Sequence, residues 1–382
     1  MSIKSNDPLL KNLQANIVKG HGRDIAFHLF FQFKQGNEIA IRNWISNFAK
    51  TELTTAAEQI ADTEVFKEAN EENDKPVADA LRKKPVFTLS LSAHGYKTLG
   101  LSTQMPDSTV FKAGMRGNAQ KLGDKERDIE ECFTHQIDMM ILVAVDAPDI
   151  AEGKADDIIK QLNGIAIIVK KQRGNVLKML GTNVGIEHFG YADGVSQPLY
   201  LEDDILDQPP ISQWDDEEAT DILLVEDFFD NSTDAKCYGS YLVFRKLEQD
   251  VSEFKAREEK IPPVKRSLGQ SDDELAGAMI VGRFEDGSPV TDFDKAVHFV
   301  TNDFDYSTDM AGSKCPYHSH IRLVNPRNGL TPGSDFRKHR ITRRGMPFDN
   351  NTAGNKRIED QSITCITEKF FPTTFQIGRA HV

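Results

Sequence analysis

Three short stretches of the chain contain residue types from which a redox site can be built. The stretch 315–327, with the sequence CPYHSHIRLVNPR, offers His320 as an axial ligand for a metal. His318 competes for this role, but residues two apart on a helix point about 200° apart, so only one of them can face a given metal. Because a single histidine is more often a structural residue, His320 carries little weight alone.

The second stretch, 187–198 (EHFGYADGVSQP), places Asp193 between two glycines. Glycines at this spacing suit a tight turn that presents the carboxylate inward, because glycine adopts backbone angles that other residues avoid. An ordinary Asp-Gly surface turn is the more common structure for such a pentapeptide in isolation. The twelve-residue string is far more specific than the pentapeptide.

The third stretch, 341–348 (ITRRGMPF), contains Arg343 and Arg344. Neighbouring side chains on a strand point to opposite faces, so one arginine could enter a pocket while the other is solvated. The alternative is that both are surface cations. Imidazole is the usual proximal ligand where a haem iron activates peroxide. The order and separation of the three stretches together therefore predict a haem site that handles peroxide.

The first half of the chain alternates strands with helices. Apolar runs and helical spacing predict strands at 26–33, 86–91, 136–145 and 165–171, and helices at 38–50, 95–99 and 150–162. We expect the polar stretch that ends at Lys84 to be a loop. The order is β-α-β-β-α-β, the split ferredoxin-like pattern. Because helices then cover one face of an antiparallel sheet, the predicted fold class is α+β.

A change of composition follows at 201–220, which is rich in Asp and Glu and contains two successive prolines. This composition favours an exposed linker. Beyond it the pattern begins again, with a strand predicted at 239–244, helices at 249–257 and 273–281, and a strand at 339–347. This second round is incomplete, because 349–382 does not clearly supply the matching strand, helix and final strand.

Composition and charge limit the class of protein. The 382 residues are 39% hydrophobic, enough for substantial cores, and the net charge of −13 disfavours a nucleic-acid or membrane partner. The four cysteines lack Cys-x-x-Cys spacing, so they indicate neither a zinc ribbon nor a disulfide framework. No run approaches the roughly 18 apolar residues of a membrane span, and residues 1–19 do not resemble a signal peptide. We therefore expect a cytoplasmic protein.

Taken together, the motifs resemble those of the dye-decolorising (DyP-type) haem peroxidases, in particular their larger-sequence subgroup. The resemblance covers about residues 10–348. Besides the three stretches above, it rests on LQANIVKGHGR at 13–23, GSYLVFRKLEQDV at 239–251, VGRFEDGSP at 281–289 and NDFD at 302–305. It implies two ferredoxin-like domains, at 1–200 and 201–382, with the second one binding the haem and incomplete at its C-terminal end.

The resemblance also implies roles for the candidate residues. His320 would be the proximal iron ligand, and Asp193 and Arg343 would be the distal pair that handles peroxide. It further implies one haem b per chain, hydrogen peroxide and an aromatic reductant as partners, and a homo-oligomer as one possible assembly. Two other functions stay open: a haem-binding or haem-transfer protein without significant turnover, and an incomplete, inactive fragment.

The tail departs from the family. Relatives continue with an apolar strand, a helix and a final strand that close the haem pocket, and 350–382 shows no such run. The closing residues 377–382 (IGRAHV) are also what a common sequencing adapter encodes when it is translated. We therefore expect the chain to be truncated and its tail not to be native, which resequencing the 3′ end of the gene would test.

Overall fold

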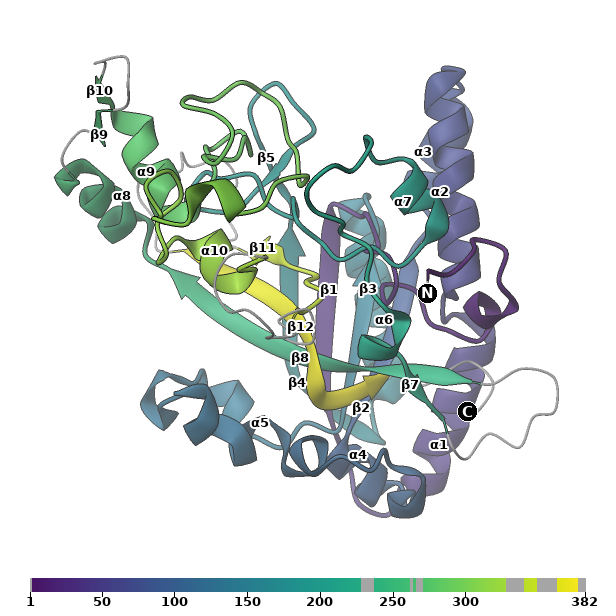
Figure 1. The fold of residues 1–382 in the computed structure, drawn as a ribbon. Helices are drawn as coiled ribbons and strands as arrows, with labels where there is room; N and C mark the ends of the chain where they lie inside the picture. The colour runs from purple at the N-terminus through teal and green to yellow at the C-terminus, as the bar shows by residue number, and fades with distance from the viewer. Residues whose placement is uncertain are drawn as a thin grey trace.

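An antiparallel β-sheet runs through the centre of the molecule, with helices on its flanks (Figure 1). The computed structural model describes residues 2–227, 237–261, 264–265, 271–327, 340–348 and 363–376, and of 264–265, 271–273 and 363–376 the backbone alone. The fold class is α+β, as predicted. Within these ranges, no helix is long and apolar enough to cross a bilayer.

The first four strands form the predicted ferredoxin-like sheet. They are β1 (Ile25–Phe33), β2 (Val86–Ser92), β3 (Met139–Ala144) and β4 (Ala166–Asn175), in the spatial order β4-β1-β3-β2 and all antiparallel. All of β3 is buried, and so is all of β1 except Gln32. A strand that is buried on both faces has a continuous apolar sequence, which is why β1 and β3 could be predicted.

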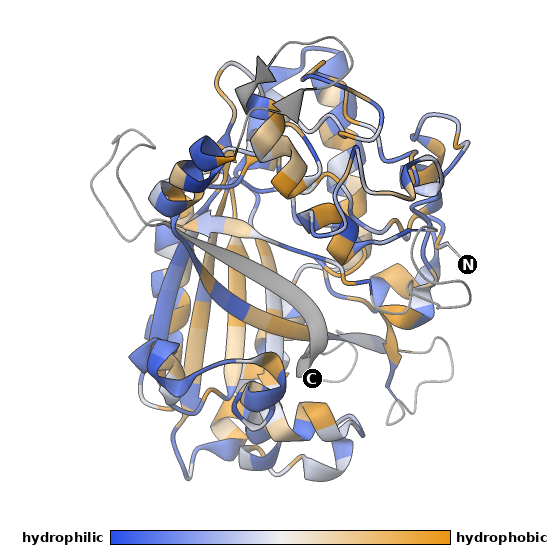
Figure 2. Ribbon diagram, turned by 60° about the vertical axis from the view of Figure 1, so that its left-hand side comes forward, coloured by the Kyte–Doolittle hydropathy of each residue, from blue (hydrophilic) through white to orange (hydrophobic). Residues whose placement is uncertain are grey.

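Helices α1 (Glu38–Thr51) and α6 (Pro148–Leu162) complete this pattern. The buried residues Ile41, Ile45 and Phe48 share one face of α1 because they are spaced three to four apart. Helix α6 begins with a proline, which is tolerated there because the first N–H of a helix has no partner within it. The buried side chains of both helices join those of the strands in the main core, whose apolar strands are visible in Figure 2.

Two helices occupy the stretch that was predicted to be a loop, and that prediction was wrong. They are α2 (Ala56–Glu71) and α3 (Lys75–Arg82), which stand at one edge of the molecule (Figure 1). A capping box begins α2: the Thr55 hydroxyl accepts from the Glu58 N–H, and the Glu58 carboxylate accepts from the Thr55 N–H. This local signal was available in the sequence.

The remaining elements are shorter, and most of them belong to the second half. They are α4 (Ala93–Thr98), α5 (Thr109–Leu122), β5 (Leu177–Lys178), β6 (Gly185–Ile186), α7 (Glu202–Leu206), β7 (Val225–Glu226), β8 (Tyr238–Gln249), α8 (Val251–Lys260), β9 (Val264–Lys265), β10 (Ser271–Asp272), α9 (Asp273–Val281), α10 (His320–Val324) and β11 (Met346–Phe348). Short 3-10 helices lie at Pro8–Lys11, Ser102–Gln104, Glu126–Asp128, Glu131–Thr134, Thr220–Ile222 and Ser307–Asp309.

The predicted elements of the second half are β8, α8 and α9. The strand predicted at 339–347 is reduced to the three residues of β11, and residue 339 lies outside the described ranges. No strand was clearly expected in the tail, and here the structure differs: β12 (Ile363–Gln376) pairs with β2, β8 and β11 and so joins the two halves of the sheet. Its sequence, ITCITEKFFPTTFQ, is rich in β-branched and aromatic residues, which favour strands.

Among the described residues no helix follows β11, so the second ferredoxin-like round is incomplete there, as predicted. Residues 349–362 and 377–382 lie outside the described part of the chain. The expectation that the tail is not native therefore stays a prediction, as does the domain limit between 200 and 201.

The acidic segment at 201–220 is not the exposed linker that its composition predicted. Its two prolines are exposed, but Trp214, Asp216 and Glu218 are buried. The guanidinium of Arg340 forms ion pairs with both carboxylates, at 3.4 Å for Asp216. Opposite charges make the burial of these groups tolerable, and Arg340 lies 124 residues from Asp216, beyond the reach of local composition.

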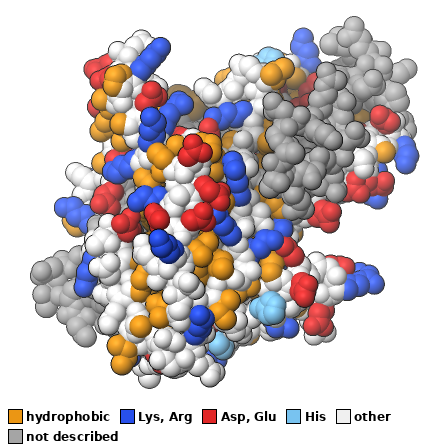
Figure 3. All heavy atoms as spheres, turned by 180° about the vertical axis from the view of Figure 1, so that it is seen from behind, with side chains coloured by type: hydrophobic (Ala, Val, Ile, Leu, Met, Phe, Trp, Pro, Cys, Tyr) orange, Lys and Arg blue, Asp and Glu red, His pale blue; other side chains and the backbone are white. Residues whose placement is uncertain are grey.

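The surface seen in Figure 3 carries acidic and basic side chains that are interspersed with apolar ones. No extended patch of a single sign covers the described residues on this face. Elsewhere on the chain, opposite charges also pair directly, as Lys171 does with Glu152 and Asp156. The negative net charge is thus not gathered into one patch on the described part of this face.

Candidate active site

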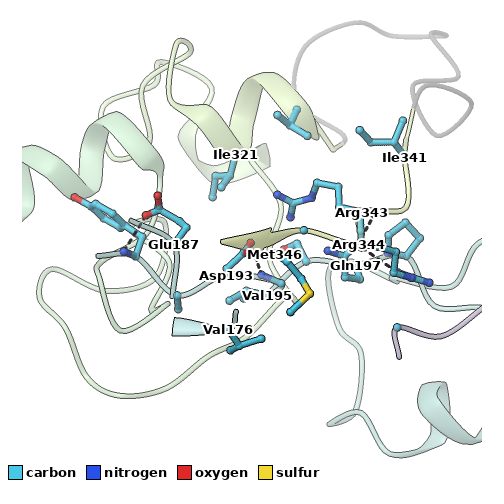
Figure 4. A pocket seen from close by; sticks show the side chains of 18 of the residues that line it. Val176, Glu187, Asp193, Val195, Gln197, Ile321, Ile341, Arg343, Arg344 and Met346 are labelled. Carbon is cyan, nitrogen blue, oxygen red and sulfur yellow. Dashed lines mark hydrogen bonds between the residues drawn. The ribbon is translucent and has the colours of Figure 1, made fainter. Parts of the chain in front are cut away.

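A cavity of about 900 Å³ brings the three candidate stretches together (Figure 4). Its size lies within the range of about 300–1,000 Å³ that is usual for ligand pockets. Asp193, His320 and Arg343 all line it, although up to 150 residues of chain separate them. The competing His318 is exposed and does not line this cavity.

Asp193 sits on a turn that only glycine-rich sequence can form. Gly190 and Gly194 have φ angles of +101° and +75°, in the region that other residues rarely adopt. The N–H of Asp193 donates to the carbonyl of Gly185 at 2.9 Å, and its carboxylate accepts from the N–H of Gly194 at 2.7 Å. These bonds orient the carboxylate, which is half-buried at the cavity wall.

Glu187 holds the same turn from the other side, a role that the sequence analysis missed. Its carboxylate accepts from the N–H groups of Phe189 and Tyr191, at 2.9 and 3.0 Å, and from the side-chain amide of Gln249 at 2.6 Å. Burial raises the pKa of Glu187 above its usual value. This buried carboxyl is therefore a positioning group that fixes the backbone just before Asp193.

The two adjacent arginines face different surroundings, but strand alternation is not the reason, because β11 begins only at Met346. Arg344 is not the solvated cation that alternation predicted, since it also lines the cavity. Arg344 donates to the carbonyls of Asn16 and Ile17, at 3.0 and 2.6 Å, and so ties the N-terminal segment to the cavity wall. Arg343 is held by its N–H, which donates to the side-chain oxygen of Gln197 at 3.0 Å. Its guanidinium points into the cavity (Figure 4) and has no hydrogen-bond or ionic partner among the described residues.

His320 is the first residue of α10, and its side chain is exposed to the cavity. Arg322, two residues later, anchors this short helix. Its guanidinium is fully buried, pairs with the Asp309 carboxylate at 3.1 Å, and donates to the Cys315 carbonyl at 2.6 Å. It also lies 4.4 Å from the ring centroid of Tyr306. The position of His320 thus depends on a buried ion pair that no local sequence pattern revealed.

Two buried cations form another part of the cavity wall. Arg283 and Arg327 are 4% and 2% exposed, and neither forms an ion pair with a carboxylate among the described residues. Arg283 donates to the side chains of Ser196 and Asn302, and Arg327 to the carbonyl of Asn302. Burial and their mutual repulsion lower the pKa of Arg283 to about 10, so it stays charged at neutral pH. An acidic group on a ligand would be stabilised here.

These residues fit a porphyrin that carries carboxylates. Apolar side chains, among them Val195, Leu247, Phe254 and Met346, line the cavity and suit a flat macrocycle. No group of three or more metal-ligating side chains exists in the described part of the chain. A single imidazole, that of His320, therefore suits a metal whose other ligands come from the cofactor itself.

Comparisons with known proteins agree with a cavity that binds haem. Residues 12–184 match the family model of the DyP dimeric alpha+beta barrel domain. The chain is 34% identical over 352 residues to the multifunctional dye peroxidase DyP2 of Amycolatopsis sp., covering 89% of this chain and 71% of that protein. It is 27% identical to the dye-decolorizing peroxidase msp1 of Mycetinis scorodonius, covering 75% of this chain and 58% of the relative.

Solved structures give the same result. The crystal structure of a DyP-type peroxidase from Anabaena sp. superposes with a TM-score of 0.83 at 35% identity, covering 98% of this chain and 80% of that one. The fold and the site thus define a haem-peroxidase class of protein. The chain belongs to the dye-decolorising (DyP-type) peroxidase family, and membership of that family implies a haem cofactor.

Proposed function

We propose that this protein is a haem peroxidase that reduces hydrogen peroxide and oxidises bulky aromatic, dye-like reductants in one-electron steps. The observation that carries the proposal is the convergence of His320, Asp193 and Arg343 on one cavity, where the Arg343 guanidinium has no partner among the described residues. An arginine that is free to meet a ligand is one that can stabilise charge as it develops.

We further propose that the cofactor is haem b, one per chain, with His320 as its proximal ligand. Its carboxylates match the buried cations Arg283 and Arg327. When bound, the haem supplies an iron that binds peroxide and stores its oxidising equivalents. The matching family model is described as a dimeric domain, which supports a homo-oligomer.

The side chains of this protein handle the proton and the charge. Cleavage of the O–O bond of hydrogen peroxide would require that a proton move from one of its oxygens to the other, which departs. Asp193 takes this proton and delivers it, because a positioned carboxylate can act first as a base and then as an acid. Arg343 stabilises the negative charge that gathers on the departing oxygen, because its guanidinium is a fixed cation that points into the cavity.

Two substitutions test the assignment. His320→Ala should abolish stable haem binding, measured as the Soret absorption of protein mixed with haemin and then desalted. His318→Ala is the matched control and should keep the band, because His318 does not line the cavity. Arg343→Leu should keep the band and lose peroxide-dependent dye oxidation by at least about 100-fold, the effect usual for removing a charge-stabilising donor.

The same experiment separates the alternatives. A Soret band without turnover in the unaltered protein would support a haem-binding or haem-transfer protein. The absence of a band would support an incomplete, inactive chain. Retention of haem by His320→Ala together with full activity would overturn the proposed ligand.

A further inference from the structure

One asparagine behind the cavity wall connects the two buried cations with the turn that carries Asp193. Asn302 belongs to the NDFD motif at 302–305, to which the proposed chemistry gives no role. It does not line the cavity, whereas Arg283 and Arg327 do. Arg283 donates to the side-chain oxygen of Asn302 at 2.7 Å, and Arg327 donates to its backbone carbonyl at 2.6 Å. Asn302 is thus a common partner of the two guanidinium groups.

The side chain of Asn302 also binds the turn. Its Nδ2 donates to the carbonyl of Val195 at 2.6 Å, and its Oδ1 accepts from the hydroxyl of Ser196 at 2.7 Å. Val195 and Ser196 follow Asp193 by two and three residues, and Val195 lies beside Asp193 at the cavity wall (Figure 4). Glu187 binds the backbone just before Asp193. The turn is therefore held on both sides of Asp193.

An amide suits all of these partners, and its orientation follows from them. Oδ1 of Asn302 accepts from two donors, the Arg283 guanidinium and the Ser196 hydroxyl, while Nδ2 meets the Val195 carbonyl. The reversed amide would place its NH₂ group against the guanidinium. Aspartate would supply acceptors alone and would place an oxygen against the Val195 carbonyl, and leucine would supply neither donor nor acceptor.

The chain on either side of Asn302 is fixed as well. The next residue, Asp303, accepts from the N–H groups of Ser212, Gln213 and Trp214, at 2.7, 2.7 and 2.8 Å. The carbonyl of the preceding residue, Thr301, accepts from the guanidinium of Arg283 at 2.9 Å. Because its backbone is anchored in this way, Asn302 can transmit a shift of the cations to the turn.

We propose that Asn302 is a positioning residue through which a carboxylate bound at Arg283 and Arg327 sets the position of the Asp193 carboxylate. This inference rests on the proposed function, in which Asp193 handles the proton of peroxide and the cations bind the carboxylates of the cofactor. Two like charges repel each other, and a bound carboxylate offsets that repulsion. The Arg283 guanidinium then takes one fixed position, and Asn302 carries this order to the backbone of the turn. Binding of the cofactor and placement of the catalytic acid are thereby coupled.

The first test measures the reaction with peroxide. Asn302→Leu and Asn302→Asp are loaded with haemin, and the Soret band is followed by stopped flow after mixing with peroxide. Both variants lose the donor to Val195 and should react at least about tenfold more slowly, because small misplacements of a catalytic group are costly. Asn302→Asp keeps acceptors for Arg283 and should keep the haemin affinity of the unaltered protein, and it also serves if the leucine variant fails to fold.

Asn118→Leu is the matched control. The side-chain amide of Asn118 is also buried and donates to two backbone carbonyls, those of Val110 and Gly114, but it lies on α5 and does not line the cavity. This variant should react with peroxide at the unaltered rate. An equal slowing of Asn118→Leu and Asn302→Asp would overturn the specific role of Asn302.

A second test does not depend on turnover. Haemin should slow amide hydrogen exchange at residues 315–324 and at the turn, 189–197, of the unaltered protein. In Asn302→Asp, haemin should protect 315–324 as before, while 189–197 should exchange about two- to tenfold faster than in the unaltered protein, as expected for one lost hydrogen bond.

Either of two results would overturn the coupling: equal protection of the turn by haemin in Asn302→Asp and in the unaltered protein, or reaction of both Asn302 variants with peroxide at the unaltered rate. A haemin-loaded, unaltered protein that does not react with peroxide contradicts the proposed function instead. The exchange of 189–197 would then still decide whether Asn302 couples the cations to the turn.

Discussion

The sheet region, residues 25–175, and the cavity region, residues 185–348, are held together by different forces. In the sheet region the large core consists of aliphatic and aromatic side chains from β1, β2, β3, α1 and α6. In the cavity region many buried groups are charged. They include Arg283, Arg322, Arg327, Asp216, Glu218, Asp286 and Asp309.

The difference separates the scaffold of this molecule from its candidate active site. Burial of apolar surface stabilises the folded state without orienting individual groups, so it suits a scaffold. Buried charges are costly unless their partners are well placed, but they fix geometry through directional bonds. The chain places its chemistry in the region where such bonds position His320, Asp193 and Arg343. The cavity region should therefore be the more sensitive of the two to loss of a single charge.

The largest expected effect follows from removing one buried carboxylate. Asp309→Ala leaves the Arg322 guanidinium buried and without its ion-pair partner, which typically costs about 3–5 kcal/mol. Denaturant unfolding should detect the loss. Trp214 can report on the cavity region in a Trp44→Phe background, because the chain has two tryptophans.

Asp305→Ala is the control for this substitution. Asp305 also accepts from a nearby N–H, that of Ser307 at 2.9 Å, but it pairs with no guanidinium among the described residues. It should cost no more than about 1 kcal/mol, as for an ordinary hydrogen bond. Equal losses for the two variants would contradict a special role for the buried pair.

Addition of haemin should stabilise one region more than the other. A ligand present at 100 times its dissociation constant stabilises the folded state by about 2.7 kcal/mol. Amide hydrogen exchange should slow in α9 and α10, which contribute Ile280 and His320 to the cavity, and change little in β1 and β3. Uniform protection across both regions would show that they unfold as one unit.

Acid should affect the cavity region first. Burial opposes ionisation, yet the N–H groups of Trp214, Gln213 and Ser212 lower the pKa of Asp303 to about 2 from its ordinary 3.8. The N–H groups of Cys315, Lys314 and Ser313 likewise hold the pKa of Asp309 below its ordinary value, against the effect of burial.

The folded state therefore binds fewer protons than the unfolded state as these carboxyls titrate. Their contribution to stability is present above about pH 4 and is lost as the pH falls toward 2. Trp214 fluorescence should change at a higher pH than that of Trp44, which packs against the core of the sheet region. If Trp44 responds first, the contrast between the regions is wrong.

The smallest effect concerns the sheet region. Ile141 of β3 is fully buried in the main core, and Ile141→Val removes one methylene group. The expected loss is about 0.5–1.5 kcal/mol, with the dye-oxidation rate unchanged. A large loss of activity would mean that the packing of the sheet core also determines the geometry of the cavity.

The features that could be predicted from the sequence are those that depend on residues close together in the chain. The strands of the sheet region were found because both faces are buried and the apolar runs are continuous. The turn around Asp193 was found because two glycines mark it, and their positive φ angles confirm the reason. By contrast, α2 was missed because its apolar spacing is weak, although the capping box of Thr55 and Glu58 was present.

The remaining features depend on partners far apart in the chain. Nothing near Trp214 shows that Arg340 will bury the acidic segment, and nothing near His320 shows that Asp309 will hold Arg322. The sequence pointed to His320, Asp193 and Arg343, and the structure brings them to one cavity. It could not indicate Glu187 as a supporting group, because the role of this residue arises from a contact with Gln249, 62 residues away.

The tie between Arg344 and the carbonyls of Asn16 and Ile17 has a consequence for biosynthesis. Arg344 is added 328 residues after Asn16, and ribosomes add about 5–20 residues per second. The N-terminal segment therefore waits on the order of 16–66 s for the residue that fixes it. Since that segment lines the cavity, the pocket is completed only late in translation, and cofactor loading must follow rather than accompany the folding of the first strands.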